Sequence, residues 1–150
     1  MLDHAAIAAR IPHQGAMCLL DAVVEWTPAS ISCRATSHRD PTNPLRAEGR
    51  LGTASAIEYA AQAMAVHGAL LAGSTGKPRF GYLAGLRAVT LHVTRLDDLP
   101  GELSINAERV AGDDDRVLYQ FAVSHDGHCL VAGRAAVVLD GESITPWHRE

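Results

Sequence analysis

Residues 53–72, TASAIEYAAQAMAVHGALLA, decide the fold, because they predict one long helix. Thr53 or Ser55 is a suitable N-cap residue, and Gly73 is a typical stop signal directly after the last helical position. Alanine, the strongest helix former, occurs throughout the stretch. Since alanine leaves little bulk on nearly every side, we expect this helix to pack closely inside a concave sheet.

The segments on both sides of this helix read as β-strands. Apolar residues alternate along them, for example at Leu103, Ile105 and Ala107, and Asp126-Gly127 is a strong signal for a tight hairpin. We expect strands over residues 17–25, 31–37, 79–96, 102–111, 116–124 and 129–139. One long helix inserted among such strands indicates an α+β domain in which an antiparallel sheet wraps the helix.

Composition limits the function classes. With 150 residues, of which 47% are hydrophobic and 20% charged, we expect one globular domain over residues 1–150, with its core at 8–140. A net charge of -4 and 13 scattered Lys and Arg residues exclude a nucleic-acid partner. Neither a signal peptide nor a membrane-spanning stretch is visible, so we expect a cytoplasmic protein with no membrane partner. Three cysteines without C-x-x-C spacing predict no metal site, and we expect no cofactor.

The central helix carries a carboxylate, Glu58, one turn from its start. Burying a carboxylate is costly, and Gln62, four residues further on, lies on the same helix face. His67 lies on the opposite face and is a poor partner for Glu58. A catalytic role for Glu58 therefore needs a second group from elsewhere in the chain. The alternative is that Glu58 faces solvent near the helix N-terminus, where negative charge is favourable.

Several motifs resemble those of one enzyme family. PHQGAMCLLDAV, residues 12–23, is similar to the opening PHxxPMLLVDxV of the FabZ-type 3-hydroxyacyl-acyl-carrier-protein dehydratases, and AIEYAAQAMA, residues 56–65, resembles their central-helix signature. FGYLAGLRAVTLHV, residues 80–93, and AGRAAVVL, residues 132–139, continue the match. The resemblance implies a hotdog fold, in which two protomers pair edge to edge. It also implies an active site where an acid from the helix of one subunit meets a histidine of the other.

The sequence departs from this family at one important place. FabZ-type enzymes carry their catalytic histidine in a Gly-His-Phe-Pro motif shortly before the helix, whereas NPLRAEGRLG, residues 43–52, contains no histidine. Arg46 falls near the expected position. The pattern is closer to the divergent ApeP-like branch found with aryl polyene clusters, which shares the PHxxxM opening and lacks the same motif.

The resemblance implies loss of water from a 3-hydroxyacyl thioester to give the trans-2-enoyl thioester, in fatty acid or aryl polyene type synthesis. Such a reaction needs a base for the C2 proton and an acid for the departing hydroxyl. We expect Glu58, with a pKa raised by apolar surroundings, to be the acid. For the base we expect His13, which lies between Pro12 and Gly15, directly after a short helix that Asp3 caps.

Both candidate histidines have other interpretations. His13 can instead be a structural residue at the start of the first strand. His38 is the alternative base, since it lies at the end of a strand and the start of an irregular loop. A histidine in such a loop can also simply be solvated.

Six further residues are expected to bind substrate. Gln62 lies beside Glu58, and Tyr82 stands where FabZ-type enzymes place a tyrosine bordering the acyl tunnel, although core packing is an alternative role. Gly49 and Gly52 would let the thioester approach the helix start, where N–H groups near Thr53 and Ala54 would receive its carbonyl.

The resemblance also implies partners. These are an acyl carrier protein bearing an acyl-phosphopantetheine, or acyl-CoA, and a second hotdog subunit in a homodimer or heterodimer.

Two functions other than dehydration stay open. A hotdog thioesterase would use Glu58 as nucleophile or general base, and a catalytically weak subunit would support an active dehydratase.

Overall fold

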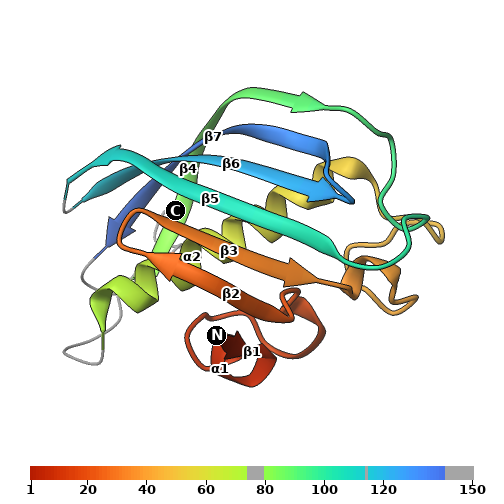
Figure 1. The fold of residues 1–150 in the computed structure, drawn as a ribbon, viewed down its shortest axis with the longest axis horizontal. Coiled ribbons are helices and arrows are strands. Elements are labelled where there is room, and N and C mark those ends of the chain that lie inside the picture. Colours follow the sequence, from red (N-terminus) through yellow and green to blue (C-terminus); the bar gives the residue numbers. More distant parts are fainter. Residues whose placement is uncertain (74–79, 114, 141–150) are drawn as a thin grey trace, which may run out of the picture.

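Helix α2 (Ala56–Ala72) lies in the hollow of one curved antiparallel sheet, as Figure 1 shows. The computed structural model describes residues 1–73, 80–113 and 115–140. Its strands are β1 (Leu2–Asp3), β2 (Ala22–Thr27), β3 (Ser30–Ala35), β4 (Phe80–Leu91), β5 (Leu103–Gly112), β6 (Arg116–His125) and β7 (His128–Asp140). Their order in the sheet is β1-β2-β3-β5-β6-β7-β4, so β4 forms an edge. The expected α+β architecture is confirmed.

The central helix ends as the sequence predicts but begins differently. Gly73 adopts φ +69°, a left-handed conformation that glycine tolerates best, and its N–H bonds to Leu70 O. At the other end, a 3-10 turn at Thr53–Ser55 precedes α2, and Ser55 makes no side-chain cap. The Thr53 hydroxyl donates instead to Val93 O at 2.6 Å. The prediction of a side-chain cap is therefore wrong, because the Thr53 hydroxyl joins the helix to the chain beyond β4.

The first long strand starts later than expected. A short helix, α1 (His4–Ala8), is capped by the Asp3 carboxylate as predicted, and a 3-10 turn follows at Gly15–Met17. β2 begins only at Ala22. Residues 18–21 lie outside any strand, and the side chain of Gln62 bonds to backbone atoms of Met17 and Leu19. The segment before β2 is therefore bonded to the helix at Met17 and Leu19, and it joins the sheet only at Asp21, whose N–H donates to Arg34 O of β3.

The remaining strands follow their sequence patterns. Asp126 and Gly127 adopt φ +51° and +81°, as a tight hairpin between β6 and β7 requires. Leu103, Ile105 and Ala107 of β5 are buried on the inner face of the sheet. β4 is shorter than the expected strand at its far end, and residue 79 lies outside the described residues.

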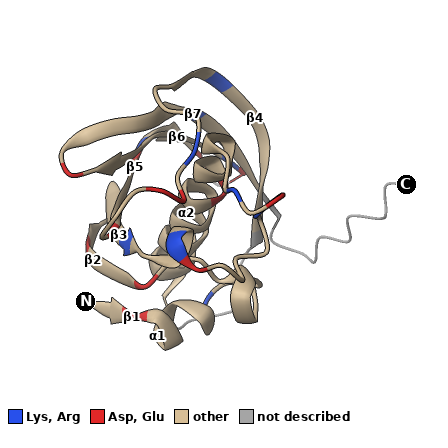
Figure 2. Ribbon diagram, turned by 90° about the vertical axis from the view of Figure 1, so that its right-hand side faces the viewer, with Lys and Arg blue, Asp and Glu red and all other residues tan. Residues whose placement is uncertain are grey.

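The sheet encloses the helix closely, as the view in Figure 2 shows. Ala56, Ala60 and Ala63 of α2 are fully buried, which confirms the close packing expected of an alanine-rich helix. Acidic and basic residues are spread over several elements in Figure 2 rather than gathered on one face. None of the helices in the described ranges has both the length and the apolar character needed to span a membrane.

Candidate active site

His13 and Glu58 meet within a single chain. His13 Nε2 lies 3.4 Å from Glu58 Oε2, and the two side chains are 26% and 37% exposed. His13 comes from the loop between α1 and the 3-10 turn at Gly15–Met17, whereas Glu58 comes from the first turn of α2. The resemblance implied an acid and a histidine from different subunits. Here one protomer supplies both groups.

Gln62 holds the His13 loop against the helix. Its Nε2 donates to Met17 O at 2.6 Å, and its Oε1 accepts from Leu19 N at 2.9 Å. The side chain is fully buried and does not line the groove described next. Because both ends of the amide are occupied by backbone atoms, Gln62 acts as a positioning residue for the loop that carries His13.

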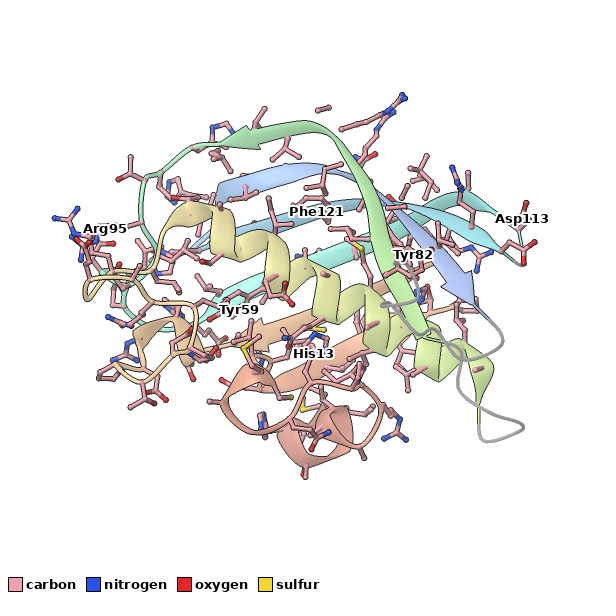
Figure 3. All side chains as sticks on the ribbon, turned by 180° about the vertical axis from the view of Figure 1, so that it is seen from behind. His13, Tyr59, Tyr82, Arg95, Asp113 and Phe121 are labelled. Carbon is pink, nitrogen blue, oxygen red and sulfur yellow. The ribbon has the colours of Figure 1, made fainter. Side chains whose placement is uncertain are left out.

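A groove of about 510 Å³ extends from this pair along α2. The helix wall combines small residues, at Ala61, Ala65 and Gly68, with the larger apolar side chains of Met64 and Leu71. Tyr82, which is 50% exposed, belongs to the opposite wall, so it does not pack in the core of this chain. In Figure 3, His13 lies beside α2, and Tyr82 and Asp113 lie toward the C-terminal end of the helix.

The expected protonation of Glu58 is wrong. Hydrogen bonding from His13 holds the pKa of the Glu58 carboxyl below its ordinary value, and this effect outweighs the opposing effect of burial. Hydrogen bonding from Gln62 acts in the same direction. Glu58 is therefore a carboxylate at neutral pH, which makes it a partner for an imidazolium rather than a ready proton donor.

His38 is a structural residue rather than a solvated loop histidine. Its side chain is fully buried, and Nε2 donates to Leu99 O at 3.0 Å. It does not line the groove. Arg46, near the place of the family histidine, donates to His38 O and Gly49 O, so it stabilises the loop before α2. Geometry thus brings His13, and not His38, to Glu58.

The glycine-rich loop lies outside the groove, so its expected role in binding the thioester carbonyl stays a prediction. Gly49, Gly52 and Ala54 are exposed, Thr53 is buried, and none of them lines the groove. The N–H of Ser55 bonds to Gly52 O, and that of Ala56 bonds to Thr53 O. The 3-10 turn therefore occupies N–H groups that a plain helix start would leave free.

Two residues at the groove were not predicted from the sequence. Tyr119 and Arg109 are direct neighbours across β5 and β6, and both line the groove. Arg109 continues the inward alternation of Leu103, Ile105 and Ala107, so the pattern itself could have revealed a charged side chain on the inner face. In the described part of the chain, His, Cys, Asp and Glu side chains form no group able to hold a metal ion.

Buried His38 predicts a loss of stability in mild acid. Burial lowers the pKa of the His38 imidazole below 6.5, so the unfolded chain binds a proton more readily than the folded chain. This stabilisation is complete above pH 6.5 and is lost as the pH falls below that value. We expect the midpoint of urea unfolding to decrease between pH 7 and pH 5, and to decrease less in His38→Gln.

The exposed histidine of the β6–β7 hairpin provides the control for that measurement. His128→Gln, at an exposed position, should keep the full dependence on pH. An equal dependence in His38→Gln and in the unmodified protein would contradict the role of His38. His67, which is also buried with a lowered pKa, would then have to account for the effect.

The helix-wrapping sheet, the edge strand β4 and the groove along the helix define this chain as a hotdog-fold protein. The sequence profile of the ApeP-like family, described as ApeP dehydratase, matches residues 5–143. The chain therefore belongs to the ApeP-like dehydratase family, and the resemblance seen in the sequence is confirmed.

Solved structures agree with this assignment. The chain is similar to a chain of the dehydratase heterocomplex ApeI:P from Xenorhabdus doucetiae, with a TM-score of 0.80, 26% identity, and coverage of 89% of this chain and 90% of that chain. A thioesterase from Haemophilus influenzae has a TM-score of 0.65 at 9% identity, covering 93% and 92%. A putative thioesterase from Silicibacter sp. TM1040 has a TM-score of 0.62 at 12% identity, covering 93% of each chain. The two thioesterases share the fold alone. No curated protein matches this sequence.

Proposed function

We propose that this chain removes water from a 3-hydroxyacyl thioester and yields the trans-2-enoyl thioester, in aryl polyene type synthesis. The observation that carries the proposal is the His13–Glu58 pair at one end of a groove beside α2. Membership of the ApeP-like dehydratase family supports the same reaction.

The pair supplies the proton transfers that the reaction needs. His13 takes the proton from C2, and the Glu58 carboxylate stabilises the imidazolium that forms. The imidazolium then donates this proton to the hydroxyl at C3, which leaves as water. The C2–H and C3–O bonds break while a double bond forms between C2 and C3. Glu58 acts here as a carboxylate, in accordance with its lowered pKa.

The groove would hold the acyl chain of the substrate. Its helix wall includes Ala61, Ala65 and Gly68 together with apolar Met64 and Leu71, and the facing strands add apolar side chains such as Leu83 and Val137. An acyl chain gains free energy by leaving water for such surroundings. The thioester would then lie near His13, carried by an acyl carrier protein or coenzyme A, which present the same pantetheine arm.

A second hotdog protein would complete the sheet. β4 is an edge strand, and it exposes large apolar side chains at Tyr82 (50%), Leu86 (40%) and Leu91 (51%). Open edges with apolar side chains favour pairing with another strand. The solved relative from Xenorhabdus doucetiae is a heterocomplex, so we propose that the partner of this chain is a different hotdog protein. Sedimentation showing a monomer at micromolar concentration, with the partner present, would contradict this assembly.

One assay separates the dehydratase from a thioesterase and from a supporting subunit. The chain, alone and with its hotdog partner, is incubated with a 3-hydroxyacyl thioester while enoyl absorbance and free thiol are followed separately. A dehydratase increases the absorbance, and a thioesterase releases thiol. A supporting subunit changes neither signal until its partner is added. Release of thiol without enoyl product would overturn the proposal.

Gly68 allows a test of the groove itself. A side chain added at Gly68 would meet open space, because no atom of the surrounding structure lies within 4 Å of the position that its Cβ would take. Gly68→Leu should therefore fill the groove beyond His13 while improving helix propensity by about 1 kcal/mol. We expect kcat/KM for a long-chain substrate to fall about tenfold or more relative to a short-chain substrate.

Gly68→Ala is the matched control, because it adds a single methyl group. The ratio of long-chain to short-chain kcat/KM should change much less in this variant. Unchanged use of the long-chain substrate by Gly68→Leu would place the acyl chain elsewhere in the molecule.

A further inference from the structure

A charged side chain interrupts the apolar inner face of the sheet. Along β5 the inward positions are Leu103, Ile105, Ala107 and then Arg109, which is half-buried. Charged side chains seldom occupy such positions without a partner. Arg109 nevertheless makes no side-chain hydrogen bond or ion pair with any part of the chain that the structure describes. Its side chain lines the groove along α2.

Neighbouring polar groups already have their own partners. The Tyr119 hydroxyl, directly across from Arg109, donates to His67 Nδ1 at 2.7 Å. His67 Nε2 donates to Thr27 O at 2.8 Å, so the direction of both hydrogen bonds is fixed. Asp113, the acidic residue nearest in sequence that lines the groove, accepts from the backbone of Asp115 and Arg116. The guanidinium group therefore keeps its donors available for a ligand.

Arg109 lies well away from the reacting pair. Its cross-strand neighbour Tyr119 contacts His67, nine residues after Glu58 in α2. Nine residues of helix correspond to about 14 Å along the axis. The groove thus has an acid–base pair near one end and an unpaired cation further along, with small and apolar side chains between them.

We propose that Arg109 is a specificity-determining residue, which binds a hydrogen-bond-accepting oxygen at the far end of the acyl chain. The preferred substrate would carry a hydroxyl or carboxylate at its ω end rather than a methyl group. A methyl end would leave the guanidinium group desolvated without a partner, whereas an oxygen would satisfy it. This inference rests on the proposed function in taking the groove as the acyl site.

The test measures binding separately from turnover. Three acyl-pantetheine amides of equal chain length, ending in methyl, hydroxyl or carboxylate, are titrated into the full chain by calorimetry. We expect the two oxygen-bearing ligands to bind about tenfold or more tightly than the methyl ligand. A stronger preference for carboxylate identifies a charged end group, and a stronger preference for hydroxyl identifies a neutral one. Both results support the role of Arg109.

Variants assign the preference to this side chain. Arg109→Met should abolish it, and Arg109→Lys should restore part of it for the carboxylate ligand, because the charge returns without the planar fork. Arg134→Met, on the exposed outer face, is the matched control and should keep the full preference. With the corresponding thioesters, Arg109→Met should raise KM for the oxygen-bearing substrates and leave kcat nearly unchanged.

Two results would overturn the inference. One is equal or tighter binding of the methyl ligand by the unmodified chain, and the other is a preference that survives in a folded Arg109→Met variant. Failure of the proposed function gives a different pattern. No enoyl product from any of the three thioesters, together with an intact preference in binding, contradicts the dehydratase and leaves the role of Arg109 standing.

Discussion

Glu58→Gln should lower the rate of dehydration about a hundredfold or more. The amide keeps the shape of the side chain and can still face His13, but it carries no charge to stabilise an imidazolium. Stability should change little, because Glu58 is 37% exposed and lies near the start of α2. The measurement is kcat for enoyl formation, with thermal unfolding recorded on the same preparation. Where the chain works only with its partner, the complex is assayed.

Glu108→Gln serves as the control, since Glu108 is exposed on the outer face of the sheet. It should retain full activity. Turnover by Glu58→Gln close to that of the control would remove Glu58 from the mechanism.

The dependence of the rate on pH decides how Glu58 works. If Glu58 acts as a carboxylate, kcat/KM should fall as the pH decreases toward the pKa of its carboxyl, which lies below 4.5 in this chain. If Glu58 had to donate its own proton, the rate would instead fall as the pH rises through that pKa. A rate that falls as the pH rises through that pKa contradicts the role of Glu58 as a carboxylate. A rate that stays high at neutral pH supports it, whereas loss of activity in acid does not distinguish the two roles, because protonation of His13 has the same effect.

Much of the fold was predictable because local signals and tertiary packing agree. Helix α2 shows this best: alanine supplies propensity, the small side chains suit a position inside a sheet, and Gly73 ends the helix in a left-handed conformation. Asp126-Gly127 likewise specifies its hairpin through backbone conformation alone. Such features depend on the residues themselves and need no knowledge of distant contacts.

Predictions were less accurate where the structure depends on contacts between residues far apart in sequence. Met17 belongs to an apolar run typical of a strand, yet its carbonyl bonds to Gln62, forty-five residues away. Gln62 shares a helix face with Glu58 as predicted, but whether its amide meets substrate or backbone depends on how the loop folds over it. His38 looks solvated because polar and irregular sequence follows it, yet its ring is fully buried and bonds to the backbone carbonyl of Leu99, a residue distant in sequence.

The candidate site itself was predictable in part. The absence of a histidine before the helix leaves His13 and His38 as candidate partners of Glu58, and the structure places His13 beside it. The protonation of Glu58 was not predictable, since apolar neighbours in the sequence suggest a raised pKa. The proximity of His13 Nε2 has the larger effect and lowers the pKa instead. Arg109 follows the alternation of β5, but a charged residue near the end of a strand is equally typical of a solvated position.

His13→Asn should reduce dehydration about as much as Glu58→Gln, by roughly a hundredfold or more. Asparagine keeps a hydrogen-bonding group beside Glu58 but cannot accept the C2 proton. In the proposed mechanism, Glu58 acts only through the imidazolium of His13. The double variant His13→Asn/Glu58→Gln should therefore lose little more activity than either single variant, because groups that act as a unit are not additive.

The same variants test the structural interpretation of His13. If His13 only shapes the loop before β2, His13→Asn should lower the melting temperature and leave the activity per folded molecule intact. His128→Asn, in the exposed hairpin, controls for loss of a histidine and should change neither quantity. Additive losses in the double variant would mean that His13 and Glu58 contribute through separate steps. The Gln62 side chain holds the loop that carries His13 through its bonds to Met17 O and Leu19 N, and neither bond involves His13. We therefore expect the His13→Asn variant to keep its fold and to lose activity through kcat.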